Sequence, residues 1–128
     1  MRDLANNIGA VLALSPAVQA ATIKGVAVDL LGFDSATLIV NTGAIVGAGD
    51  YTAKLQESDT TTDGDFADVV ASKLVGTLPA SLTADNAFKQ GYIGTKRYIR
   101  VVVTKNAGTS IAAGAAIVKG NARSRPVA

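Results

Sequence analysis

The sequence predicts an all-β protein, an antiparallel β-sandwich or jelly-roll-like barrel of about six to eight short strands. Strand-like segments recur along the 128 residues, with turn-forming residues between them about every ten residues. The long helical pattern that parallel sheets need for their crossovers is missing. Hydrophobic residues make up 48% of the chain and charged residues 17%, so we expect a packed core.

The first 21 residues have neither a helical nor a strand period. Two asparagines, Gly9 and Pro16 interrupt the apolar run. We therefore expect residues 1–21 to form an extended N-terminal arm outside the domain, ordered only against neighbouring subunits. The assembly contacts of this arm would be Arg2, Leu4, Ile8, Val11, Leu12 and Leu14.

The predicted sandwich domain, residues 22–121, opens with two strands. Residues 22–30 alternate between apolar and polar side chains, which is typical of a half-buried strand. The Gly-Phe-Asp-Ser segment at 32–35 predicts a turn, and residues 36–43 predict a largely buried strand. Two glycines break the pattern between 44 and 50, where we expect a loop.

The middle of the chain alternates once more and then becomes irregular. In the strand predicted at 51–58, Tyr51, Ala53 and Leu55 share one side with Glu57. Residues 66–78 fit both helical and strand spacing. The β-branched residues and glycine around them favour an irregular strand.

The most basic stretch of the chain, residues 94–106, predicts a long strand. Its core side would carry Ile99, Val101 and Val103, while Tyr98 and Arg100 would face solvent or a partner. We expect the next residues to turn the chain and 111–121 to return as the hairpin partner of this strand. Residues 122–128 form a short basic C-terminal tail.

The side chains that usually carry catalysis are missing. The chain has no His and no Cys, so it lacks the commonest general base, the commonest zinc ligands and a thiol nucleophile. Ser72 and Lys73 are adjacent, and neighbours on a strand point to opposite faces. We expect no enzymatic activity and no cofactor.

One hydrophilic loop gathers Asp59, Asp63 and Asp65. Aspartate and glycine build ordinary hairpin tips, and a plain turn explains this composition. A calcium site is the alternative, because clustered carboxylate oxygens bind calcium. The spacing does not match an EF-hand loop, so we expect no metal here.

Acidic and basic residues are unevenly distributed along the chain. Residues 1–68 hold nine acids and three bases, whereas residues 69–128 hold nine bases and one acid. This asymmetry permits head-to-tail contacts between copies or docking on an acidic partner. The contact candidates in the basic half are Arg97, Arg100, Arg123 and Arg125. Too few aromatics accompany them for a nucleic-acid surface, and no apolar run is long enough to cross a membrane.

Five segments resemble a family of small tailed-bacteriophage head proteins. They read MRDLANNIGAVLALSPAV, LLGFDSATLIVNTG, LQESD, GYIGTKRYIRV and KGNARSRP. The resemblance covers almost the whole chain, and its motifs are structural. It implies a capsid decoration, or cement, protein of the virion: a β-rich homo-oligomer, commonly a trimer, on the outside of the head.

The resemblance also implies partners and a location. The partners would be the major capsid protein and other copies of this chain, without direct contact to nucleic acid or membrane. The protein would be made in the host bacterial cytoplasm and would end on the capsid exterior. Two alternatives remain: a head–tail connector or tail component, and a carbohydrate-binding module on the virion surface.

Overall fold

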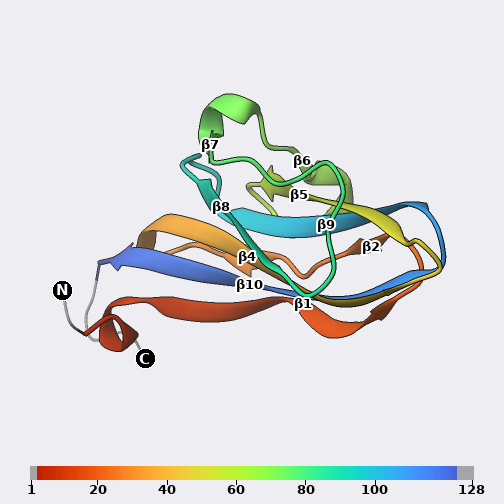
Figure 1. Cartoon of the computed structure of the whole chain (residues 1–128). Helices are drawn as coiled ribbons and strands as arrows, with labels where there is room; N and C mark the ends of the chain where they lie inside the picture. Colours follow the sequence, from red (N-terminus) through yellow and green to blue (C-terminus); the bar gives the residue numbers. More distant parts are fainter. Residues whose placement is uncertain (1–2, 124–128) are drawn as a thin grey trace.

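Two antiparallel sheets packed face to face form a β-sandwich in the computed structural model, which describes residues 3–123 (Figure 1). The fold class is therefore as predicted. Sheet A has the order β1-β10-β4-β8-β7, with bounds Gly9–Gln19, Ser110–Ala122, Phe33–Val46, Ala87–Tyr92 and Leu74–Val75. Sheet B has the order β2-β9-β5-β6, with bounds Ile23–Lys24, Tyr98–Ala107, Asp50–Ser58 and Ala67–Asp68, and β3 (Val28–Asp29) also pairs with β9.

Three short 3₁₀ turns complete the described part of the chain: η1 (Ala5–Asn7), η2 (Asp63–Asp65) and η3 (Ala71–Lys73). No helix within residues 3–123 has the length and apolar character needed to span a membrane. The segment that fits both helical and strand spacing, residues 66–78, contains β6, η3 and β7 and is irregular between them.

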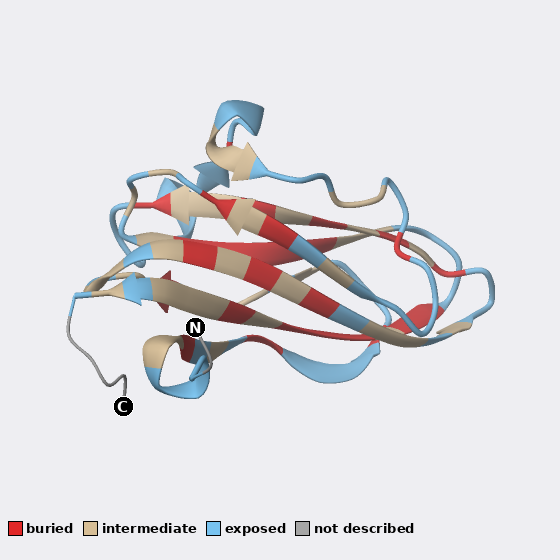
Figure 2. Cartoon of the chain, turned by 60° about the vertical axis from the view of Figure 1, so that its left-hand side comes forward, coloured by how far each residue is buried: buried red, intermediate tan, exposed pale blue. Residues whose placement is uncertain are grey.

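The core lies between the two sheets and is filled by alternate residues of the long strands. Leu38 and Val40 of β4 face Ile99, Val101 and Val103 of β9, and all five are fully buried. Figure 2 shows this alternation of buried and less buried positions along the strands. The predicted core side of β9 is confirmed, because a strand places every second side chain on the same face.

The prediction of an arm outside the domain is wrong for the described residues. Residues 9–19 form β1, which pairs with β10 from Gly9↔Lys119 to Gln19↔Ile111. The Val26 N–H also donates to the Ala13 carbonyl oxygen (3.0 Å), which links this strand to the side of sheet B. The sandwich therefore begins before residue 22, because β10 supplies backbone partners and the core covers Ala13 and Leu14.

The predicted hairpin between the strand in residues 94–106 and residues 111–121 is also wrong. β9 belongs to sheet B and β10 to sheet A, so the chain crosses between layers at this turn. It crosses again from β4, which continues to Val46, to β5. β10 extends to Ala122 and so takes the first residue of the expected tail. The rest of that tail, including Arg125, lies outside the described residues, as does Arg2.

The two crossings lie side by side at one end of the sandwich, at the right in Figure 1. Gly108 has a φ of +80°, and a Cβ there would overlap the Ala48 carbonyl group. Gly47 has a φ of +63°, and a Cβ there would overlap Thr109. Both positions require glycine because of backbone conformation and close approach at once.

We expect Gly108→Ala to lower the free energy of unfolding by about 2 kcal/mol or more, because it adds left-handed strain and steric overlap. Urea unfolding of the variant and the wild type measures this. Gly64→Ala is the control, because nothing lies within 4 Å of a Cβ at Gly64. Equal effects of the two substitutions would contradict the packing of the two crossings.

Candidate functional site

A groove of about 470 Å³ opens at the end of the sandwich opposite the crossings. Its walls are residues 30–36, from the β3–β4 turn and the start of β4, and residues 92–97, between β8 and β9. Arg123, just beyond β10, completes the lining. We call this the end groove. Leu31 and Ile93 in its walls are 64% and 61% exposed, so large aliphatic side chains face solvent here.

Tyr92 holds the 93–97 wall in place. Its ring is buried, its hydroxyl donates to Glu57 Oε1 (2.6 Å), and it accepts from the Lys96 N–H (3.2 Å). Burial, and then the bond to Glu57, raise the pKa of Tyr92 above its usual range. The hydroxyl therefore stays protonated and acts as a fixed structural donor.

Asp29 connects the two walls of the end groove. Arg97 donates to both its carboxylate oxygens (3.0 and 2.8 Å), and the Leu31 N–H donates to Oδ1 (2.9 Å). The Arg97 hydrogen bond is the main reason that the pKa of Asp29 is lowered to about 2. Burial opposes it less strongly, and the Leu31 N–H adds a still smaller lowering of this pKa. A carboxylate held by a bidentate arginine fixes the geometry of both loops.

The other two cations of the end groove are also paired. Arg123 Nη2 lies 3.2 Å from Asp34 Oδ1. The backbone N–H of Arg123 donates to the Gly32 carbonyl oxygen (2.9 Å). Lys96 Nζ lies 2.9 Å from Asp59 Oδ2. Because these pairs are substantially exposed, each is worth little for stability. The end groove thus offers aliphatic contact area bordered by oriented charges, which suits docking of another protein.

The predicted contact residues lie in different places. Arg97 and Arg123 both line the end groove. Leu4, beside η1, is 57% exposed, and Leu12 on the outer face of sheet A is 54% exposed. Ile8 and Val11 are half-buried, and Val11 packs against the core. Leu14 is a core residue with 4% exposure, so its assignment to a contact surface is wrong.

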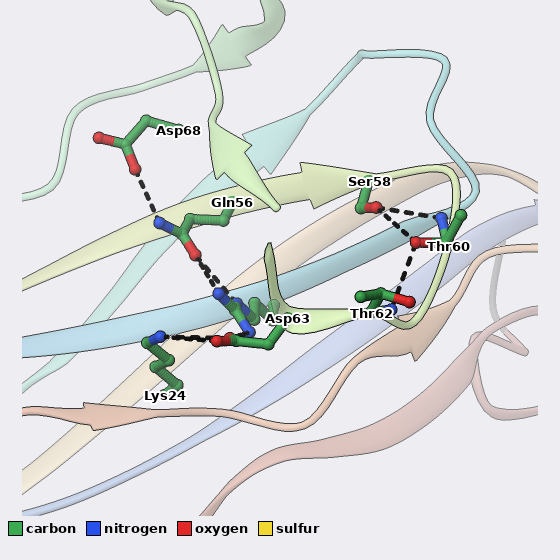
Figure 3. A network of polar contacts seen from close by, with 8 residues as sticks. Lys24, Gln56, Ser58, Thr60, Thr62, Asp63 and Asp68 are labelled. Atoms are coloured by element: carbon green, nitrogen blue, oxygen red, sulfur yellow. Dashed lines mark hydrogen bonds and ion pairs between the residues drawn. The ribbon is translucent and has the colours of Figure 1, made fainter. Parts of the chain in front are cut away.

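Arg100 is also not a free surface residue, although its strand side was predicted correctly. Its guanidinium donates to Gln56 Oε1 (2.9 and 2.8 Å) and Asp63 Oδ1 (2.6 Å) and lies 4.2 Å from the centre of the Phe66 ring. Figure 3 shows Gln56 and Asp68 on one side of this network and Asp63 with Lys24 on the other. The loop around η2 folds back over the outer face of sheet B and buries this arginine.

Each of the three aspartates of the hydrophilic loop is engaged by another side chain of the chain. Asp59 pairs with Lys96, Asp63 with Arg100 and Lys24, and Asp65 accepts from the Thr60 hydroxyl (2.6 Å). Among residues 3–123, three or more acidic side chains nowhere gather closely enough to hold a metal ion. Hydrogen bonds from Arg100 and Lys24 lower the pKa of Asp63.

Leu31 and Ile93 were not singled out from the sequence. Both are ordinary aliphatic residues beside glycine, and because leucine and isoleucine are most often buried, no local signal marks these two as exposed. Leu31 precedes Gly32, whose φ of +90° makes the turn that directs this segment outward. The exposure of the two side chains depends on where the fold places the two loops that carry them.

No protein-family model matches this chain, and no curated protein is significantly similar to it in sequence. One similar solved structure is described as the structure of infectious bursal disease virus, Gx strain, with a TM-score of 0.44 and 14% identity. The match covers 88% of this chain and 31% of the viral chain, so this chain spans less than a third of that protein's length. A likeness of this strength does not extend to function.

We expect the stability of the protein to fall as the pH drops from about 4 to about 2, in part through Asp29. Its pKa is lower in the folded state, so its contribution is present above the unfolded pKa and lost as the folded carboxylate is protonated. Urea unfolding at pH 2 to 5 should show a weaker pH dependence for Asp29→Asn than for the wild type. Parallel pH profiles would contradict the Asp29–Arg97 contact.

Proposed function

We propose that this chain is a non-enzymatic structural protein of a tailed-phage virion, a decoration protein on the outside of the head. The observation that carries the proposal is the end groove, where Leu31 and Ile93 are exposed between the oriented Arg97 and Arg123. An exposed apolar centre with a charged rim is the usual anatomy of a protein–protein interface, and arginine is enriched at such interfaces. The resemblance to small phage head proteins supplies the partner, the major capsid protein.

The proposed mechanism is adhesion repeated over a symmetric lattice. Asp29 and Tyr92 hold the walls of the end groove before binding, so little conformational freedom would be lost on docking. One groove provides a small contact area and a weak bond. Many copies on one shell, joined to each other as a homo-oligomer, would strengthen each bond by raising the effective concentration of the others. The head would then resist outward pressure better.

The glycan-binding alternative has little support in the side chains of the fold. Sugar sites use exposed aromatic rings, and the chain has no Trp and three Tyr. Tyr51 is fully buried and donates to the Gln19 carbonyl (2.8 Å), and Tyr92 is buried beneath the 93–97 segment. Tyr98 is half-buried with Arg97 over its ring. We therefore retain the head–tail connector as the main competing function.

We expect quantitative mass spectrometry of purified virions to find this protein in hundreds of copies per particle, because decoration follows the icosahedral shell. The major capsid protein in the same sample is the internal standard. A copy number of about 6 or 12 would instead identify a connector or tail component.

We expect the double variant Leu31→Asp/Ile93→Asp to lose at least about tenfold in affinity for undecorated heads, because it places charges in the apolar walls of the end groove. Co-sedimentation with heads measures this binding. Val46→Asp is the matched control, because Val46 is 54% exposed at the other end of β4. Full head binding by a folded double variant would contradict docking through the end groove.

A further inference from the structure

Three long segments of the chain contain no charged residue: 4–23, 35–49 and 107–118. They supply all of β1 and most of β4 and β10, which lie next to each other in sheet A. The registers align Leu12 with Ala116 and Ile39, and Ala10 with Val118. The outer side of these three strands is therefore an uncharged face. Its outward side chains are mostly apolar, namely Ala10, Leu12, Val18, Ile39, Ala116 and Val118, and β4 adds the uncharged polar residues Thr37 and Asn41.

The uncharged face has a ridge and a furrow. Residues 112–116 of β10 carry only Ala and Gly and form the floor of a furrow of about 510 Å³. Leu12 and Val18 of β1, which are 54% and 68% exposed, stand along one side of it. Asn41, Thr42 and Gly43 of β4 form the other side. An antiparallel sheet usually presents polar residues to water, so an apolar outer face indicates a binding partner.

The outer face of sheet B cannot be that partner in a neighbouring copy. It carries Lys24, Lys54, Arg100 and Asp68, whose charges are already paired within the chain. Packing an apolar surface on these pairs would remove water from charges without giving them new partners. Within the described part of the chain, the surface that matches the uncharged face in polarity is the same face of another copy.

We propose that two copies of this chain pack sheet A against sheet A, about a two-fold axis, through the uncharged face. In such a two-fold contact both copies use the same surface, so a charge near the axis would face its own equivalent, and a charge elsewhere on the face would lose water against an apolar surface. The uncharged face carries no charged side chain on β1, β10 or β4. Across the sheet from Ile39, the next strand, β8, places Lys89, which is the first charged residue in that direction. The ridge of Leu12 and Val18 in one copy would enter the furrow over β10 in the other.

The size of this contact sets its strength. Three strands about 4.8 Å apart and about eight residues long cover roughly 400 Å² per copy. Stable complexes bury roughly 800 Å² per partner, so we expect a weak dimer at about 10 µM to 1 mM protein. This dimer goes beyond the proposed function and uses a different surface. The resemblance implies a trimer instead, and the oligomeric state measured in solution distinguishes the two.

Sedimentation equilibrium of the full chain between about 10 µM and 1 mM tests the proposal. We expect the mass to rise from one chain to two, with no weakening between low and high salt, because no ion pair forms across the contact. Leu12→Lys and Val18→Lys should each raise the dissociation constant at least about tenfold. Both side chains are exposed, so both variants should fold. Thermal unfolding confirms this. Val70→Lys, with 54% exposure near η3, is the matched control.

The inference would be overturned if the wild-type protein stayed monomeric to 1 mM or formed trimers. It would also be overturned if Leu12→Lys dimerised as strongly as the wild type. An assay of binding to undecorated heads distinguishes a failure of the dimer from a failure of the proposed function. Wild-type dimers that leave heads bare would contradict the proposed function alone. A monomeric wild type that decorates heads would contradict the dimer alone. If Leu12→Lys also removed head binding from that monomer, the uncharged face would belong to the shell contact instead.

Discussion

The close packing of the two inter-sheet crossings is the constraint on which the other features of this molecule depend. Gly47 and Gly108 let the β4–β5 and β9–β10 turns approach each other within backbone contact. Because the chain changes layer at both turns, β4 and β10 become neighbours in sheet A, and β5 and β9 in sheet B. A hairpin at either turn would place charged and uncharged strands together in one sheet.

This layer change separates charge between the two sides of the sandwich. Segments without charge, which are far apart in the sequence, gather on sheet A, while the outer side of sheet B carries a paired network around Arg100. The loop that holds Asp63 covers that network and gives the buried guanidinium its partners. Sheet B thus has its polar groups satisfied internally, and sheet A leaves an apolar surface to be covered.

The third distinct surface is the end groove, which two local contacts hold in shape. The Tyr92 hydroxyl links the 93–97 segment to Glu57, and the Arg97–Asp29 pair links it to the turn before β4. A groove with fixed walls, exposed aliphatic side chains and oriented charges favours recognition of a folded partner. In the two proposals made above, the end groove and the uncharged face would each bind a different neighbour.

The sequence alone determined the all-β class and the core sides of β5 and β9, because alternation is a local property that the backbone period converts directly into faces. Tertiary structure decided the rest. The membership of residues 9–19 in sheet A depends on β10, about a hundred residues away, and no local pattern marks that pairing. The burial of Arg100 depends on a loop 37 residues earlier in the chain. A turn that returns to the same sheet and one that crosses to the other use the same residues, so only the packing of both turns together distinguishes them.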